Sequence, residues 1–253
     1  GPGLIDVLLS MRGTVGRIYL PPDANCLLSV SDHVFRSRNY VNLVVIDKQP
    51  ELQWLDMDAA EQHCERGVGV WPWAGNEPAG SDGEPDIVMA CAGDVPTLET
   101  MAAVALLRQL VPDLVVRVVN VVDLMTLFPR DVHPHGLSQA TFVETFTADA
   151  DVVFAFHGYP RELHQILHGR PAAARFHVHG FREQGTTTTP FDMVVLNEMS
   201  RYHLALEAVH RARRTPARVP ELMEHCNQML ERHRDYIVER FEDLPEVRDW
   251  TWS

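Results

Sequence analysis

The chain has 253 residues, and its 22 lysine and arginine residues against 35 aspartate and glutamate residues give a net charge of −13. Such an acidic balance argues against nucleic acid or an anionic membrane surface as the main partner. The length suffices for one large or two modest domains with real cores. No signal peptide or long apolar span is visible, so we expect a soluble, cytoplasmic protein.

The first 53 residues carry the pattern of an incomplete α/β domain. Residues 4–10 read as the end of a helix and residues 16–20 as a strand. Asp23 or Asn25 can cap the helix that follows. The apolar run at residues 40–46 is typical of a second, buried strand. Two strands with one and a half helices do not complete such a domain, and we expect the open sheet edge to associate with a partner chain.

Lys48, the only lysine of the chain, lies directly after this second strand in the sequence Asp47-Lys48-Gln49-Pro50. In open α/β sheets, ligands bind at the carboxyl ends of the strands. A lysine there offers a phosphate group a compact positive charge. Lys48 is therefore a candidate phosphate-binding residue, with an ordinary surface lysine as the alternative.

Residues 54–84 are predicted to join two domains, with a short helix over residues 56–66 and a linker rich in glycine, proline, tryptophan and acid over residues 67–84. The second domain, residues 85–213, opens with a strand at residues 87–92, a helix and another strand at residues 114–119. This order indicates a parallel sheet with a crossover helix.

The turn between this strand and helix, Gly93-Asp94-Val95-Pro96, is a candidate ligand-binding turn. It is not a GxGxxG motif, its proline removes an N–H donor, and its acid would repel a diphosphate. A dinucleotide site is therefore not expected.

The remaining segments continue the alternation of helices and strands. A helix is expected over residues 192–211, and an amphipathic helix lies in the tail, residues 214–253. The other expected elements are a loop or short helix at 124–135, helices at 138–146 and 161–168, and strands at 151–156 and 175–180.

The side chains of this domain give only weak catalytic signals. His177 and His179 share one strand face, and His133 and His135 flank a proline, but no HExxH or zinc-knuckle spacing occurs. No metal site is predicted within the chain. The four cysteines, Cys26, Cys64, Cys91 and Cys226, are widely spaced, and we expect free, mostly buried thiols in a reducing compartment.

Several longer strings together resemble phosphoketolase, a thiamine-diphosphate enzyme related to transketolase. They are IYLPPDANCLLSV, NLVVIDKQPELQWL, CAGDVPTLET, VRVVNVVDLM, HPHGL, FHGYP and GTTTTPFDMVVLN. The resemblance covers residues 1–211 and weakens in the tail. It implies the C-terminal portion of the enzyme: the last part of a pyrimidine-binding domain, a linker, and a C-terminal domain with a five-stranded, mostly parallel sheet covered by helices on both faces.

The resemblance also implies an activity for the intact enzyme. It cleaves xylulose 5-phosphate, and often fructose 6-phosphate, with inorganic phosphate to acetyl phosphate and an aldose phosphate, using thiamine diphosphate and Mg or Ca. Lys48 matches the lysine of the family that contacts substrate phosphate. Gly1, Pro2 and Gly3 match residues just after an active-site histidine, and Gln49 is expected near the active site. A homodimer or higher oligomer is implied.

No catalytic, cofactor-binding or metal-binding residue is expected within this chain, and the chain alone is expected to be structural and inactive. An alternative is a stand-alone binding or regulatory module with the same fold. Its ligand site would then combine the GTTTTPFD loop, residues 185–192, with the face that carries His177 and His179.

Overall fold

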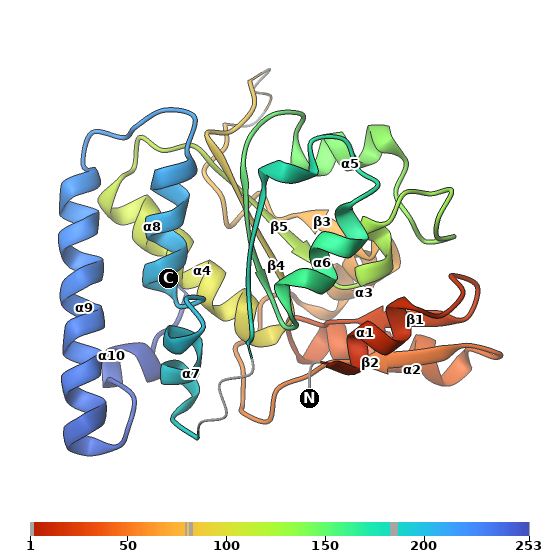
Figure 1. Cartoon of the computed structure of the whole chain (residues 1–253), viewed down its shortest axis with the longest axis horizontal. Coiled ribbons are helices and arrows are strands. Elements are labelled where there is room, and N and C mark those ends of the chain that lie inside the picture. The colour runs from red at the N-terminus through yellow and green to blue at the C-terminus, as the bar shows by residue number, and fades with distance from the viewer. Residues whose placement is uncertain (1–2, 79, 81–82, 183–186, 253) are drawn as a thin grey trace.

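The computed structural model describes residues 3–78, 80, 83–182 and 187–252. At its centre is a five-stranded sheet in the order β3 (Val68–Val70), β5 (Val116–Val121), β4 (Ile87–Ala92), β6 (Val152–Phe156) and β7 (Phe176–Gly180). Strand β3 runs antiparallel to β5, and the other neighbouring pairs are parallel. Helices cover both faces of the sheet (Figure 1), which confirms the predicted α/β class with a mostly parallel sheet.

The central strand β4 (Ile87–Ala92) is buried along its whole length. Because side chains alternate across a strand, Ile87 and Met89 join one core while Val88 and Ala90 join the other. An unbroken apolar run is what a strand covered on both faces requires.

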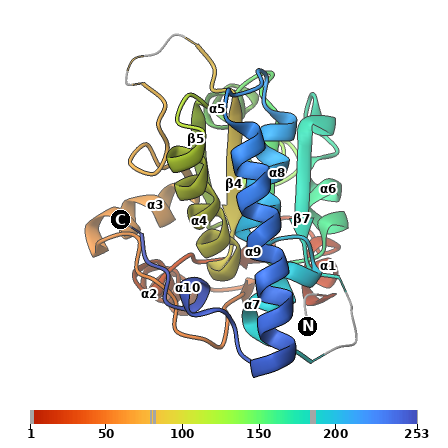
Figure 2. The same cartoon turned by 90° about the vertical axis from the view of Figure 1, so that its left-hand side faces the viewer.

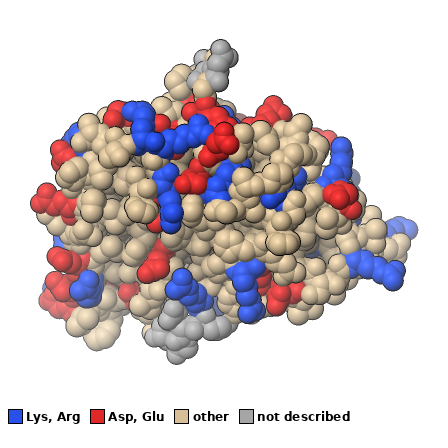
Figure 3. Space-filling view, turned by 45° about the horizontal axis from the view of Figure 1, so that its top comes forward, with Lys and Arg blue, Asp and Glu red and all other residues tan. Residues whose placement is uncertain are grey.

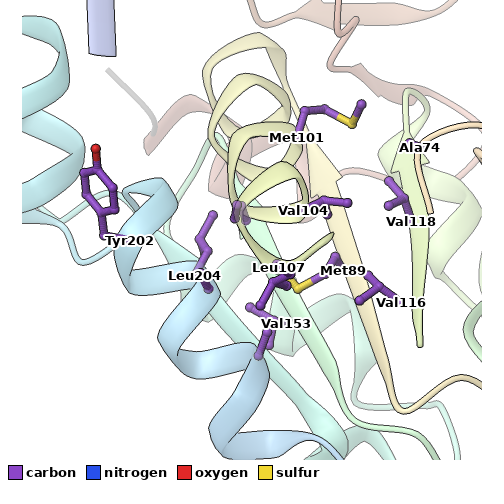
Figure 4. Close-up of a cluster of buried hydrophobic side chains, with 14 of the residues drawn as sticks. Ala74, Met89, Met101, Val104, Leu107, Val116, Val118, Val153, Tyr202 and Leu204 are labelled. Atoms are coloured by element: carbon purple, nitrogen blue, oxygen red, sulfur yellow. The ribbon is translucent and has the colours of Figure 1, made fainter. Parts of the chain in front are cut away.

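The first core lies between the sheet and α4 (Asp94–Leu110), α8 (Arg201–Arg211) and α9 (Val219–Arg240). Figure 4 shows Met89 and Val153 of the sheet facing Val104 and Leu107 of α4, with Leu204 of α8 beside them. Figure 2 shows α9 lying along the outside of α8, so the tail helix packs on the body of the domain.

The second core lies on the opposite face of the sheet, under α1 (Gly3–Leu9), α5 (Gln139–Phe146) and α6 (Pro160–Leu167). Phe142, Phe146 and Phe176 pack together in it with ring centroids 4.9–5.8 Å apart. Ile5 and Leu8 of α1 belong to the same core. Apolar packing therefore binds the N-terminal helix to the part of the chain that carries the five-stranded sheet, which we call the main domain.

Strands β1 (Gly16–Tyr19) and β2 (Val41–Val44) form a separate two-stranded parallel sheet. The prediction that the second strand is buried is wrong, because Val41 is exposed and Asn42, Leu43 and Val44 are only half-buried. This strand pairs with one neighbour and has no described strand along its other edge.

Two further predictions need correction. Val68–Val70, inside the expected linker, forms the edge strand β3, and Asn76 bonds to the backbone of Leu114 and Val116, so the described part of this segment lies against the sheet. The helix expected over residues 192–211 is two helices, because Glu198 has a φ of 54° and interrupts the backbone hydrogen bonds after α7 (Pro190–Leu196).

The remaining elements are α2 (Ala24–Arg36), α3 (Met57–Arg66), β5 (Val116–Val121), the 3-10 helices at Leu124–Leu127 and Ala173–Arg175, β6 (Val152–Phe156), β7 (Phe176–Gly180) and α10 (Pro245–Arg248). They follow the expected order, apart from α10 and the 3-10 helix at Ala173–Arg175, which the sequence did not predict. Asp23, one of the two candidate caps of α2, accepts an amide hydrogen bond, as do Asp56 and Ser138 at the starts of α3 and α5.

The surface carries charges of both signs (Figure 3), and the cysteines are free and mostly buried, as expected from the sequence. On the face seen in Figure 3, acidic and basic side chains are interspersed among uncharged residues. All four cysteines are free, and Cys26, Cys91 and Cys226 are buried. Within the described ranges, no helix is both long enough and apolar enough to cross a bilayer.

Candidate functional site

A cavity of about 1000 Å³ lies where the N-terminal segment meets the carboxyl ends of the main sheet. Lys48, Gln49 and Glu51 line it from the segment after β2, and His157 and Arg182 from the segments after β6 and β7. Carboxyl ends of parallel strands are where α/β proteins bind ligands. The volume is large enough for a small phosphorylated metabolite.

The structure brings together three of the residues predicted near a phosphate site. Lys48 and Gln49 line the cavity directly, and Gly3 begins α1, whose next two residues, Leu4 and Ile5, also line it. The side chain of Lys48 is exposed, and no ion pair joins its ammonium to a described acid. Gly1 and Pro2 lie outside the described residues.

Asp94 joins the segment that carries Lys48 to the main domain through hydrogen bonds. Its carboxylate accepts hydrogen bonds from the backbone N–H of Asp47 at 2.5 Å and of Val95 at 2.8 Å, and lies 3.0 Å from Nδ1 of His157. Although burial alone would raise the pKa of Asp94, the bonds from His157 and the two amides lower it. Asp94 is therefore an ionised anchor and not a free group in the turn.

Glu51 lines the same cavity, but its pKa is shifted in the opposite direction from that of Asp94. Burial, together with the nearby carboxylates of Asp94, Asp47 and Glu99, raises the pKa of Glu51 to about 8. A neutral carboxyl group can donate a hydrogen bond to an oxygen of a ligand. The cavity thus offers a cation and a neutral donor on one short segment.

A buried ion pair forms part of the cavity wall. Both side chains, Glu99 of α4 and Arg201 of α8, are only 3–4% exposed, and they meet at 2.7 Å. Arg201 also donates its backbone N–H to Glu99 at 2.6 Å. Since its charge is neutralised by Glu99, Arg201 is less available to an anionic ligand than Lys48.

Residues of the C-terminal tail line another side of the cavity. Asp243 accepts hydrogen bonds from the hydroxyl of Thr189 and from the backbone N–H of Phe191. Thr189 caps α7, and Thr188 bonds to Asp192 at 2.6 Å. The described part of the GTTTTPFD loop is therefore held by carboxylates, while Gly185 and Thr186 lie outside the described residues.

The histidine pairs are placed away from this cavity. His179 bonds to the carbonyl of Glu198, and His177 lies 3.5 Å from Asp151; neither lines the cavity with Thr188 and Thr189. His135 bonds to Asp123 at 2.5 Å. Within the described part of the chain, no cluster of three or more histidine, cysteine, aspartate or glutamate side chains could hold a metal ion.

Comparison with known proteins places the whole chain in one family. A family model described as the XFP C-terminal domain matches residues 48–252. A second, described as D-xylulose 5-phosphate/D-fructose 6-phosphate phosphoketolase, matches residues 1–37. The chain belongs to the phosphoketolase family. The two matches confirm the resemblance drawn from the motifs.

Individual phosphoketolases show the same relationship. A probable phosphoketolase of Rhodopseudomonas palustris (strain HaA2) is 57% identical over 252 residues, which cover 100% of this chain and 32% of the relative. One of Chlorobaculum tepidum is 52% identical, again over 100% of this chain and 32% of the relative. The chain thus spans about a third of the length of the curated phosphoketolases it matches.

Solved structures share the fold at low identity. Transketolase from Leishmania mexicana superposes with a TM-score of 0.56 and 13% identity, over 85% of this chain and 28% of that one. A split-gene transketolase described as an inactive beta4 tetramer gives 0.51 and 14%, over 78% and 59%. The fold of this phosphoketolase portion is therefore transketolase-like.

Sequence reasoning missed three residues of the site, Glu51, Asp94 and His157, as cavity or anchoring groups. In the sequence alone, Asp94 is visible only as an acid that would repel a diphosphate. Its bonds join residues 47 and 63 positions away in the chain, and no local pattern reports such distant contacts. The position of Asp94 at a strand's carboxyl end was the one available signal.

Proposed function

We propose that this chain is the C-terminal part of a phosphoketolase that cleaves xylulose 5-phosphate, and also fructose 6-phosphate, with inorganic phosphate. The C2–C3 bond of the ketose breaks, a carbon–oxygen bond to phosphate forms, and acetyl phosphate, an aldose phosphate and water are released. The observation that carries the proposal is that two phosphoketolase models match residues 1–37 and 48–252.

Within this activity, Lys48 has the role of a phosphate-binding residue. Its ammonium lies on the cavity and can donate up to three hydrogen bonds to phosphate oxygens. Gln49 follows it on the same wall, and the neutral carboxyl group of Glu51 adds a donor that does not repel an anion. These groups bind and orient a phosphorylated substrate.

Thiamine diphosphate with a magnesium or calcium ion would supply the carbon–carbon bond cleavage in the longer enzyme. The described residues of this chain do not fit either group, since they form no cluster of metal-binding side chains and the cavity carries Asp47 and Asp243 beside Lys48. We therefore assign both to other parts of the enzyme, which works as a homodimer or higher oligomer. This chain has a structural role and contributes Lys48 to the binding of substrate phosphate.

The test is the formation of acetyl phosphate. The longer enzyme, with xylulose 5-phosphate, inorganic phosphate, thiamine diphosphate and magnesium, should produce it, and residues 1–253 alone should not. The isolated chain should also give no heat of binding with thiamine diphosphate and magnesium in calorimetry. A longer enzyme that makes no acetyl phosphate, or an isolated chain that binds the cofactor, would contradict the proposal.

A further inference from the structure

The carboxyl ends of β4 and β6 carry two residues that the proposed function leaves without a role, Asp94 and His157. The two strands are parallel neighbours, with Ala92 paired to Phe156. The residues that follow them therefore leave the sheet at the same edge, facing the segment that carries Lys48.

The close approach of these two residues depends on Gly93. Its φ is 105°, a conformation that residues with a side chain rarely adopt. A Cβ atom at this position would lie 2.5 Å from Cβ of His157. A glycine is thus required for the turn that presents Asp94 to His157.

Asp94 uses both carboxylate oxygens in defined contacts. Oδ1 lies 3.0 Å from Nδ1 of His157 and accepts the N–H of Val95. Oδ2 accepts the N–H of Asp47. The Asp94 side chain is 9% exposed and that of His157 is 17% exposed, so water competes little for these bonds. Such bonds to a buried charge are stronger than neutral ones.

The bond to Asp47 fixes the backbone one residue before Lys48. The carboxylate of Asp47 in turn accepts the N–H of Gln49 at 3.1 Å, which closes a local turn around the lysine. The backbone from which the Lys48 side chain extends is therefore positioned by Asp94 of the main domain, which lies 47 positions after Asp47.

We propose that Asp94 and His157 are positioning residues for Lys48: Asp94 holds the backbone of the Lys48 segment, and His157 holds Asp94 in the orientation that this requires. The inference rests on the proposed function for its catalytic consequence. The C-terminal domain then acts on the reaction by placing the phosphate-binding ammonium, in addition to its role as a scaffold.

The first arm of the test reads the backbone directly, without activity. In the longer enzyme, Asp94→Asn keeps the shape but removes the negative charge and one acceptor oxygen. It can therefore no longer accept the N–H groups of both Asp47 and Val95, and any bond that remains is a weaker, neutral one. Hydrogen–deuterium exchange of the peptide that contains Asp47 should become about tenfold faster or more. Unchanged exchange would overturn the proposal.

The matched control is Asp86→Asn. Asp86 precedes the same strand at its opposite end. As a whole residue it is 8% exposed, against 7% for Asp94. Its carboxylate accepts the N–H of Val115 at 2.8 Å and a hydrogen bond from Arg214. Its loss should accelerate exchange near Val115 and leave the Asp47 peptide as in the parent enzyme. Faster exchange at Asp47 in this control would mean a general loosening and would also overturn the proposal.

The second arm reads catalysis. Asp94→Asn should raise KM for phosphate or sugar phosphate by about tenfold to a hundredfold with kcat changed by less than about threefold. Combined with Lys48→Ala it should add nothing, because no ammonium is left to position. Additive losses would overturn the positioning role.

The two arms separate this inference from the proposed function. Should Lys48→Ala leave all Michaelis constants unchanged, the phosphate role of Lys48 fails, while the exchange arm still decides whether Asp94 holds the segment. Should Asp94→Asn not fold, His157→Ala replaces it, since the bond from Asp47 to Asp94 can persist there. A smaller rise in exchange and in KM is then expected, and its absence would overturn the proposal.

Discussion

Glu99 and Arg201 meet across the interface of α4 and α8 as an ion pair that is almost fully buried, with three hydrogen bonds between them. One of the three comes from the first backbone N–H of α8, so Glu99 also caps that helix. The pair fixes the relative position of two helices that line the cavity beside Lys48.

Breaking this pair should be costly. Glu99→Gln or Arg201→Met each leaves a buried charge without its partner, and we expect the free energy of unfolding to fall by about 3–5 kcal/mol. Urea denaturation followed by circular dichroism measures it. The matched control is Arg36→Met, since the pair of Arg36 with Asp32 is 79% and 60% exposed and should cost less than about 1 kcal/mol. Equal losses at the two sites would contradict this account.

Acid should weaken the contact between the N-terminal segment and the main domain through His133. Its Nδ1 accepts the N–H of His135 at 3.0 Å, and its Nε2 lies 3.1 Å from Nη1 of Arg17 and 3.3 Å from the carbonyl oxygen of Gly16. Burial, with the charge of Arg17 nearby, lowers the pKa of His133 to about 4.

The sign follows from the protonation states. Between the ordinary pKa near 6.5 and the folded value of about 4, the unfolded chain binds the proton that the folded chain excludes. Stability should therefore fall on acidification by about 1.4 kcal/mol per pH unit in this window. His133→Gln, which cannot titrate, should flatten the profile, and parallel profiles of the two proteins would count against the assignment.

Glu51 should give the opposite pH dependence. Its pKa is raised from 4.5 to about 8 in the folded chain, which therefore holds a proton that the unfolded chain releases. The resulting stabilisation is complete below pH 4.5 and is lost as the pH rises to 8. Glu51→Gln mimics the neutral acid, so its advantage over the parent protein should grow across this window by up to about 1.4 kcal/mol per pH unit. A constant difference would contradict a neutral Glu51.

The isolated chain should associate through α2. Leu28 and Phe35 are 61% and 86% exposed, and they lie seven residues apart on one helix face. Replacing both by serine should lower the association measured by analytical ultracentrifugation. Val238→Ser on α9, which is 72% exposed, is the control for an exposed apolar residue elsewhere. If the control has the larger effect, the face on α2 is not the one that associates.

The elements that the sequence predicted best are those whose burial is uniform. The unit from β4 to β5 was expected as an apolar strand, a crossover helix and a second strand, and the structure follows this order. The break at Glu198 was missed because apolar spacing continues through it. Strand β3 was missed because three residues carry no readable alternation.

The site was predicted only in part, for a different reason. The position of Lys48 on the cavity could be predicted because its turn follows an apolar run, and strand ends are local features of sequence. The bonds of Asp94 to Asp47 and His157 arise from the packing of three strand ends, and the high pKa of Glu51 from carboxylates of other segments. Such groupings become visible only in three dimensions.

The most direct test of the account is steady-state kinetics of Lys48→Ala in the longer enzyme, with Arg36→Ala on the exposed face of α2 as the control. Loss of the ammonium should raise the Michaelis constant for sugar phosphate or inorganic phosphate severalfold, up to about a hundredfold, while the control stays at the parent value. Michaelis constants for both substrates that do not change in Lys48→Ala would contradict the central claim that this lysine binds substrate phosphate.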